Sequence, residues 1–123
     1  MSRRAIVLFA HGARNADWAR PFENLKQQLG ALRPGERIEL AFLELMQPTL
    51  EKCVAGLQAE GIQAVKVVPV FFGLGGHLKN DLPRLVRAIS SKFESIRITV
   101  EPPIGEQPEV IAAIAQAVAR RSG

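Results

Sequence analysis

Short apolar runs of strand length alternate four times with segments whose apolar residues follow a helical spacing. The runs cover residues 4–10, 37–43, 64–70 and 96–100. Strands buried on both faces read as uninterrupted apolar runs, so this alternation predicts an α/β fold with a parallel four-stranded sheet and helices on both faces. We predict a flavodoxin-like domain with strand order 2-1-3-4, because the first and third runs are the most uniformly apolar.

Apolar spacing and capping residues predict the helices between these strands. Asn15 is a candidate N-cap for the first helix, and Gly61 is a typical end for the second, which Pro48 would open. The third helix is expected to begin at Asp81, just before Pro83. The last helix carries an apolar stripe of Val110, Ile111, Ile114 and Val118.

Length and composition favour one domain, residues 1–123, in a reducing compartment. The chain has 123 residues, without a linker or low-complexity tract, and a single cysteine. That cysteine, Cys53, excludes an internal disulfide and is expected to be buried. The apolar run after the basic start is too short for a signal peptide or a membrane span, so we expect a soluble, cytoplasmic protein.

The charge balance favours an anionic partner of small size. The formal net charge is +4 and the pI is about 9.8. Tyrosine is absent and no basic run is interleaved with aromatic residues, which argues against a nucleic-acid partner.

Polar side chains gather where the strands end. The carboxyl ends of parallel strands share one edge of the sheet, so the loops that follow them form a common rim where such folds bind ligands. Both histidines of the chain are expected there, with two basic and two acidic residues: His11, Arg14, Glu44, His77, Lys79 and Glu101.

Two interpretations of the histidines stay open from the residues alone. Two neutral imidazoles, with or without a carboxylate, could bind a divalent transition metal and leave positions open for exchange. Alternatively, each histidine caps a helix or bonds a loop carbonyl. His11 and His77 lie on different loops and form no local metal motif, so sequence spacing does not decide between these roles.

The glycines before the third helix also allow more than one role. Gly73, Gly75 and Gly76 could cradle a phosphate, as in a nucleotide binder, or simply form a turn. They match neither the dinucleotide fingerprint nor the Walker loop.

The charged rim residues likewise have a binding and a structural interpretation. Arg14 and Lys79 could hold ligand carboxylates, or they could be solvated surface charge. Glu44 could accept a proton or form an ion pair, whereas Glu101 is expected to be structural. Of Phe71 and Phe72, at most one should face a bound ligand, because neighbouring strand residues point in opposite directions.

Three segments together resemble the CbiX/SirB family of class II tetrapyrrole chelatases. They are residues 6–14 (IVLFAHGAR), 42–50 (FLELMQPTL) and 68–83 (VPVFFGLGGHLKNDLP). The resemblance implies insertion of Co²⁺ or Fe²⁺ into sirohydrochlorin, in the cobalamin or siroheme pathway, with His11 and His77 binding the metal. Family members usually have a serine where this chain has Ala13. The loop of this chain therefore lacks one hydroxyl group.

The resemblance also implies a single chelatase-like domain and indicates how its site is assembled. Short members look like half of the longer chelatases and act as homodimers with a cleft between subunits. The chemistry of metal insertion, independently of the resemblance, gives further roles. Gly75 and Gly76 would make room for the ring, Arg14 and Lys79 would meet its carboxylates, and Glu44 would assist His11 and His77 in catalysis. The divalent metal is a substrate, and no permanently bound cofactor, nucleic acid or membrane is expected. The alternative function is non-catalytic metal binding or delivery.

Overall fold

A computed structural model describes residues 3–121, so both ends of the predicted 1–123 domain lie outside the described residues. Its elements follow the predicted alternation of strand and helix. In chain order they are β1 (Arg4–Ala10), η1 (Ala16–Ala19), α1 (Arg20–Leu32), β2 (Arg37–Phe42), α2 (Leu50–Ala59), β3 (Ala64–Pro69), α3 (Leu78–Lys92), β4 (Arg97–Val100), η2 (Ile104–Glu106) and α4 (Pro108–Arg121).

The four strands form one parallel sheet in the order β2-β1-β3-β4, which confirms the predicted order. In the register, Ala5 of β1 lies opposite Arg37 on one side and Val65 on the other. Central strand β1 has most of its side chains buried, on both faces, whereas β3, also central, buries only alternate residues. A run that is apolar on both faces avoids water only in the middle of a sheet.

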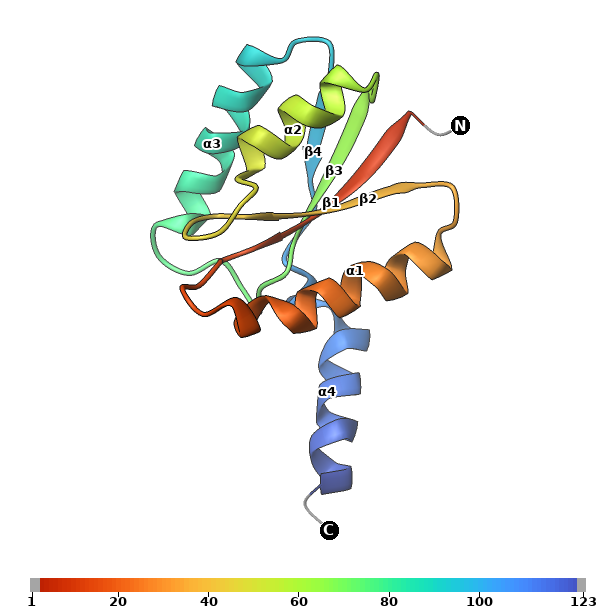
Figure 1. Cartoon of the computed structure of the whole chain (residues 1–123). Coiled ribbons are helices and arrows are strands. Elements are labelled where there is room, and N and C mark those ends of the chain that lie inside the picture. The colour runs from red at the N-terminus through yellow and green to blue at the C-terminus, as the bar shows by residue number, and fades with distance from the viewer. Residues whose placement is uncertain (1–2, 122–123) are drawn as a thin grey trace.

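Helices α2 and α3 cover one face of the sheet and build the larger core (Figure 1). Odd-numbered β1 residues, such as Val7 and Phe9, point into this core. Both helices present buried apolar stripes to it: Leu50, Cys53, Val54 and Leu57 from α2, and Leu82, Val86 and Ile89 from α3. Burial raises the pKa of the Cys53 thiol to about 11, which fits the predicted structural role of this residue.

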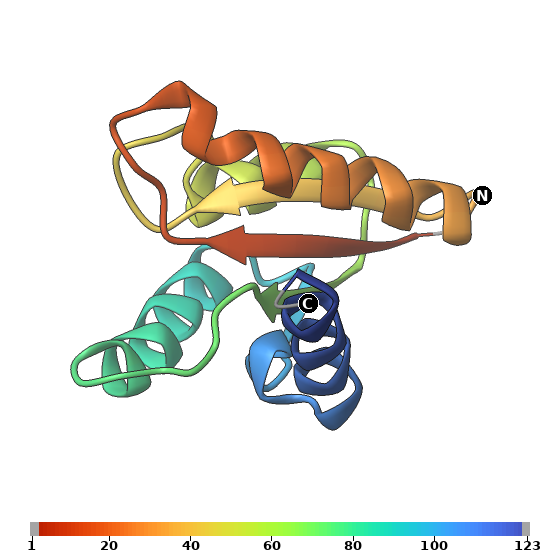
Figure 2. The same cartoon turned by 90° about the horizontal axis from the view of Figure 1, so that it is seen from below.

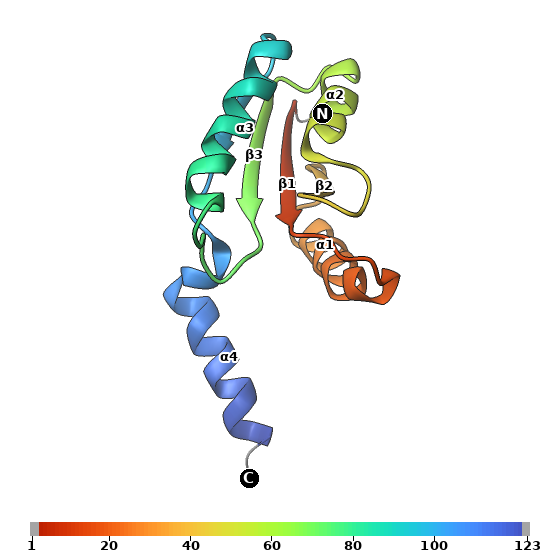
Figure 3. The same cartoon turned by 90° about the vertical axis from the view of Figure 1, so that its left-hand side faces the viewer.

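Helix α1 covers part of the opposite face. Its half-buried Phe22 and Leu29 pack with Leu8, Leu40 and Phe42 from β1 and β2. Helix α4 covers neither face: it leaves the edge where β4 ends and projects away from the sheet (Figures 1 and 3). In Figure 2, which looks from below, α4 points toward the viewer. Helices therefore lie on both faces, as predicted, but the fourth is not one of the covering helices.

Helix α3 begins earlier than the predicted Asp81. It starts at Leu78, because the carbonyl of His77 accepts hydrogen bonds from the N–H groups of Asn80 and Asp81, at 3.1 and 2.8 Å. Pro83 therefore lies inside the helix, where it removes one backbone donor without ending the helix.

The caps of the first two helices follow the sequence more closely. The Asn15 side chain accepts from the N–H of Asp17, as a cap of the short helix η1 that precedes α1. The second helix does not open at the predicted Pro48: α2 begins at Leu50, and the Thr49 side chain caps it by accepting from the backbone N–H of Lys52. Gly61 follows the end of α2 with a φ of 88°, as predicted. Within the described residues, every helix is too short or too polar to cross a membrane.

Candidate functional site

Hydrogen bonds between the strands continue past the ends of β1, β2 and β3 and bind their loops together. Leu43 N–H donates to the Ala10 carbonyl at 2.8 Å, and Glu44 N–H donates to the His11 carbonyl at 3.1 Å. On the other side of β1, Val70 N–H donates to the Phe9 carbonyl at 2.8 Å. The loops that carry His11 and Glu44 are thus held side by side, as the rim prediction requires.

Gly12 permits this close approach. Its φ is 92°, and a Cβ atom at this position would lie 1.8 Å from the carbonyl oxygen of Glu44. A side chain here would clash with backbone and strain the left-handed conformation. The glycine directly after His11 therefore fixes the distance between the loops that follow β1 and β2.

The His11 ring packs against the loop that follows β3. Its ring centroid lies 4.5 Å from that of Phe71, with the rings tilted by 41°. Phe71 is 9% exposed and also contacts Phe9, whereas Phe72 is 70% exposed. Phe71 therefore supports His11, and Phe72 is the member of the pair that is free to meet a ligand.

His77 ends the glycine loop and is the N-cap residue of α3. Gly76 adopts a φ of 46°, and the Gly75 carbonyl accepts from the N–H of Leu78 at 3.1 Å. The His77 backbone caps the helix, but its exposed side chain makes no capping hydrogen bond. The imidazole is therefore free to bind a ligand at the rim, and Lys79 follows in the first turn of α3.

The remaining predicted residues divide into exposed and paired groups. Arg14, Glu44 and Lys79 are exposed, and none of them forms an ion pair within residues 3–121. Glu101 approaches Lys66, with Oε1 and Nζ 3.8 Å apart, which agrees with its predicted structural role.

The described part of the chain contains no group of three His, Cys, Asp or Glu side chains that could hold a metal ion. Metal binding at this rim would therefore depend on fewer protein ligands from one chain. A site of two imidazoles leaves most coordination positions open to water or to another ligand. Such a site suits transfer of a metal better than its permanent storage.

Sequence reasoning missed two packing roles at the rim. Phe71 supports the His11 ring rather than serving as a wall for a ligand. Gly105, in the loop after β4, holds Phe71 in turn, because its N–H donates to the Phe71 carbonyl at 2.8 Å. A Cβ on Gly105 would lie 2.5 Å from that oxygen. A glycine in a rim loop was the available signal, but its partner was not visible in the sequence.

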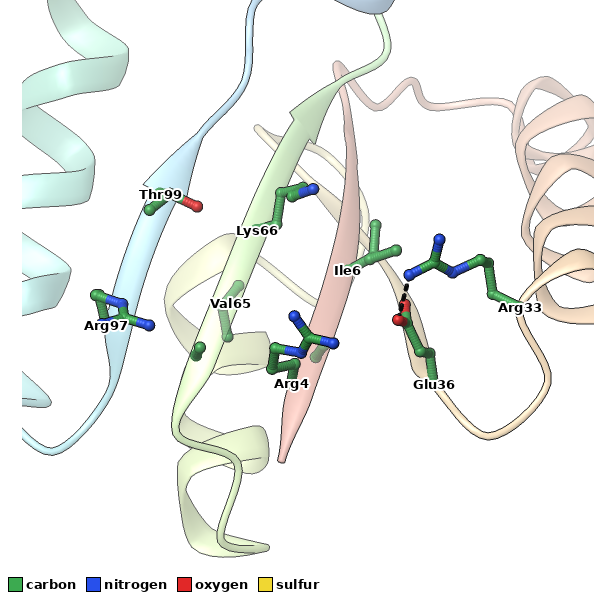
Figure 4. A pocket seen from close by; sticks show the side chains of 10 residues that line it. Arg4, Ile6, Arg33, Glu36, Val65, Lys66, Arg97 and Thr99 are labelled. Atoms are coloured by element: carbon green, nitrogen blue, oxygen red, sulfur yellow. Dashed lines mark hydrogen bonds and ion pairs between the residues drawn. The ribbon is translucent and has the colours of Figure 1, made fainter. Parts of the chain in front are cut away.

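Two hollows lie away from the histidines, on the face of the sheet that α1 partly covers. One, of about 170 Å³, is lined by basic side chains from β1, β3 and β4, including Arg4, Lys66 and Arg97 (Figure 4). Arg33 and Glu36 form an ion pair at its margin. The second hollow measures about 540 Å³ and continues from the first along β1 and β3. Its lining is mainly apolar, with Lys66, Glu101, Gln107 and Glu109 as its polar members.

The chain matches the model of the CbiX family over residues 5–121. It is 30% identical over 106 residues to a sirohydrochlorin cobaltochelatase of Saccharolobus islandicus, with 81% of each chain covered. It is also 29% identical to a sirohydrochlorin ferrochelatase of Bacillus subtilis, with 91% of this chain and 43% of the relative covered. The chain thus spans about half the length of that relative.

Solved structures show the same fold. A CbiX protein from Marinobacter aquaeolei VT8 superposes with a TM-score of 0.86 at 30% identity, and the match covers 96% of both chains. The chelatase SirB from Bacillus subtilis subspecies spizizenii, in complex with cobalt, gives a TM-score of 0.82 at 28% identity. That match covers 98% of this chain and 51% of SirB.

Proposed function

The chain belongs to the CbiX family, and we propose that it is a sirohydrochlorin chelatase that inserts Co²⁺ or Fe²⁺. The observation that carries the proposal is that both histidines lie on loops at the ends of the two central strands, on a chain that matches this family throughout. The named relatives favour a chelatase over the metal-delivery alternative.

In the proposed reaction, His11 and His77 receive the metal. A neutral imidazole binds Co²⁺ or Fe²⁺ through a ring nitrogen, and the open positions accept the pyrrole nitrogens as water leaves. The tilted contact with the Phe71 ring limits the orientations of the His11 ring. The exposed His77 lies on a glycine loop that can adapt as the metal passes to the ring.

The reaction must also remove two protons. One divalent metal replaces two pyrrole N–H protons, so the charge balances when both protons leave the ring. We assign this task to Glu44 and to a histidine that has released the metal, because both groups can accept a proton at the rim. Glu44 is held beside the His11 loop by its backbone hydrogen bond to the His11 carbonyl.

The carboxylates of sirohydrochlorin would be bound by cations at the rim. Arg14 and Lys79 are exposed and have no acidic partner within residues 3–121. Gly75 has no neighbour within 4 Å of a built Cβ, so it and Gly76 leave space for a flat ring beside His77. We expect Arg14 and Lys79 to affect substrate affinity more than turnover.

We further propose that the enzyme works as a homodimer in the cytoplasm. A tetrapyrrole is large for the rim of one small domain, and this chain spans 51% of SirB. A second copy would supply an equal length of chain. The free and buried Cys53 fits a reducing compartment.

The proposed function is tested by following the absorbance spectrum of sirohydrochlorin after the enzyme is mixed with Co²⁺, or with Fe²⁺ under anaerobic conditions. We expect His11→Ala and His77→Ala each to lower kcat/KM by about a hundredfold or more, because each removes a metal ligand. Lys79→Ala should instead raise KM. Glu94→Ala changes an exposed residue at the opposite edge of the sheet and serves as the control.

Wild-type rates in both histidine variants would overturn the assignment of the metal site. Metal binding without any change in the sirohydrochlorin spectrum would overturn the chelatase proposal and favour metal delivery.

A further inference from the structure

A further carboxylate lies at the rim, on the loop that follows β4. Glu106 is the last residue of η2 and is exposed. Within residues 3–121 its side chain forms no ion pair and no hydrogen bond. Glu101, at the end of the same strand, differs because it lies 3.8 Å from Lys66. The negative charge of Glu106 is therefore available to a ligand that approaches the rim.

Close backbone packing holds η2 against the loop that leads to His77. The Gly105 N–H donates to the Phe71 carbonyl at 2.8 Å. A Cβ on Gly105 would lie 2.5 Å from that oxygen and 2.6 Å from the Cα of Phe72. Only glycine allows so close an approach. The turn before Glu106 and the loop after β3 thus lie side by side at the rim (Figure 3).

The Glu106 carboxylate itself reaches the glycine loop. A Cβ on Gly73 would lie 3.0 Å from Oε2 of Glu106. Because Gly73 has no side chain, this oxygen lies directly beside the loop backbone. His77 ends the same loop, and its exposed imidazole makes no capping hydrogen bond. Glu106 is therefore placed at the start of the segment whose end carries a proposed metal ligand.

The order of the strands arranges the rim side chains in a row. The loops that follow β2, β1, β3 and β4 carry, in that order, Glu44, His11, His77 and Glu106. A carboxylate therefore flanks the histidine loops on each side. The Glu44 backbone is bonded to the His11 loop, and the Glu106 side chain touches the loop of His77.

A divalent metal ion needs such a carboxylate to reach this rim. The formal net charge of the chain is +4, and Arg14 and Lys79 add positive charge where the metal must arrive. A carboxylate beside the entrance offsets this repulsion and raises the local concentration of cations. One carboxylate oxygen among water ligands holds Co²⁺ or Fe²⁺ weakly, whereas an imidazole nitrogen is the better ligand for these ions. The metal would therefore move on to His77.

We propose that Glu106 is the entry ligand for the metal, which takes hydrated Co²⁺ or Fe²⁺ from solvent and passes it to His77. One water leaves the metal when the carboxylate oxygen binds, and the carboxylate leaves when the imidazole nitrogen binds. Only ligands are exchanged, so the metal keeps its oxidation state. The inference rests on the proposed chelatase function and adds an entry step before the ring is metallated.

The rate of metal association tests this role without turnover. The protein is mixed with Co²⁺ alone in a stopped-flow instrument, and the absorbance of the protein-bound cobalt is followed. Glu106→Gln keeps the shape of the side chain and removes its charge, so association should slow by about tenfold. Glu106→Asp should retain most of the rate. Glu94→Gln removes the same charge at the opposite edge of the sheet and is the matched control, with an unchanged rate.

Two further measurements separate entry from later steps. An entry ligand is absent from the final complex, so Glu106→Gln should leave the equilibrium affinity for Co²⁺ unchanged, whereas His77→Ala should weaken it. With Co²⁺ and sirohydrochlorin both saturating, kcat of Glu106→Gln should stay within about twofold of the wild-type value. Circular dichroism checks that the variants are folded.

Four results would overturn the proposal. They are an unchanged association rate in Glu106→Gln, an equal slowing in Glu94→Gln, a Co²⁺ affinity of Glu106→Gln as weak as that of His77→Ala, and a fall in kcat at saturation. The third would make Glu106 a permanent ligand, and the fourth would place it in proton removal. Failure of the chelatase proposal is a different result, because the wild type would then bind Co²⁺ without metallating sirohydrochlorin.

Discussion

Helices α3 and α4 leave the same rim of the sheet, have similar lengths and each carry apolar residues on one side. Helix α3 buries Leu82, Val86 and Ile89 against β1 and β3, and so fixes the position of His77 at its start. Helix α4 buries none of its residues. The difference shows that an amphipathic pattern specifies that a surface must be covered, but not which part of the assembly covers it.

The largest expected contrast is in stability. Ile89→Ala empties a site with no solvent exposure and should lower the free energy of unfolding by about 2–5 kcal/mol. Ile114→Ala should change it by less than about 0.5 kcal/mol at concentrations where the protein is monomeric. Urea unfolding with matched m-values measures both. Equal losses of unfolding free energy in the two variants in dilute solution would show that α4 is packed within its own chain. The contrast between α3 and α4 would then be wrong.

Thiol reactivity gives a second contrast, between the covered face and α4. At pH 8 the buried Cys53, with its pKa raised to about 11, should hold about one thiolate per thousand molecules. A cysteine introduced as Gln116→Cys, on the outer side of α4, should be alkylated about a hundredfold faster.

The pH dependence of alkylation sharpens this contrast. Because its raised pKa keeps the thiol protonated, the Cys53 rate should rise about tenfold per pH unit from pH 8 to 10, whereas the rate at residue 116 should level off near pH 9. Comparable rates at pH 8 would mean that α2 does not shield Cys53.

The smallest expected contrast concerns the base of α4, the one part of this segment that is tightly packed. Gly105→Ala forces a methyl group against the Phe71 carbonyl and should cost about 1–3 kcal/mol. Gly56→Ala, in α2, meets no atom within 4 Å and should stabilise the fold by about 0.5–1 kcal/mol.

The same two variants can be assayed for the rate of metal insertion into sirohydrochlorin. Gly105→Ala should slow it, because Phe71 supports His11, and Gly56→Ala should leave it unchanged. A neutral Gly105→Ala variant in both assays would remove this link between α4 and the site.

The sequence was sufficient to predict the order of the strands in the sheet and to predict which residues lie on the loops at its rim. The central place of β1 follows from its sequence, because its run is apolar on both faces. Strand β3 has the exposed Lys66 on one face, so its central place depends on its pairing with β1 and β4. His11 and His77 could be placed at the rim because parallel connections put every strand-to-helix loop on one edge.

Finer features depended on contacts that leave no local signal. The start of α3 at Leu78 depends on the His77 carbonyl, and the support of His11 depends on Phe71, which the sequence does not distinguish from Phe72. The projection of α4 was equally invisible, because an apolar stripe has the same spacing whether its partner lies in the same chain or in another.

The single tryptophan adds a practical consequence to the division of the sheet into two faces. Trp18 contacts Phe22, with ring centroids 4.5 Å apart and the rings tilted by 37°, in the apolar cluster beneath α1. Its fluorescence therefore reports on that face alone, while alkylation of Cys53 reports on the face beneath α2. The native chain thus carries two independent optical and chemical probes, and coincident denaturation curves from both would establish that the two layers melt as one cooperative unit.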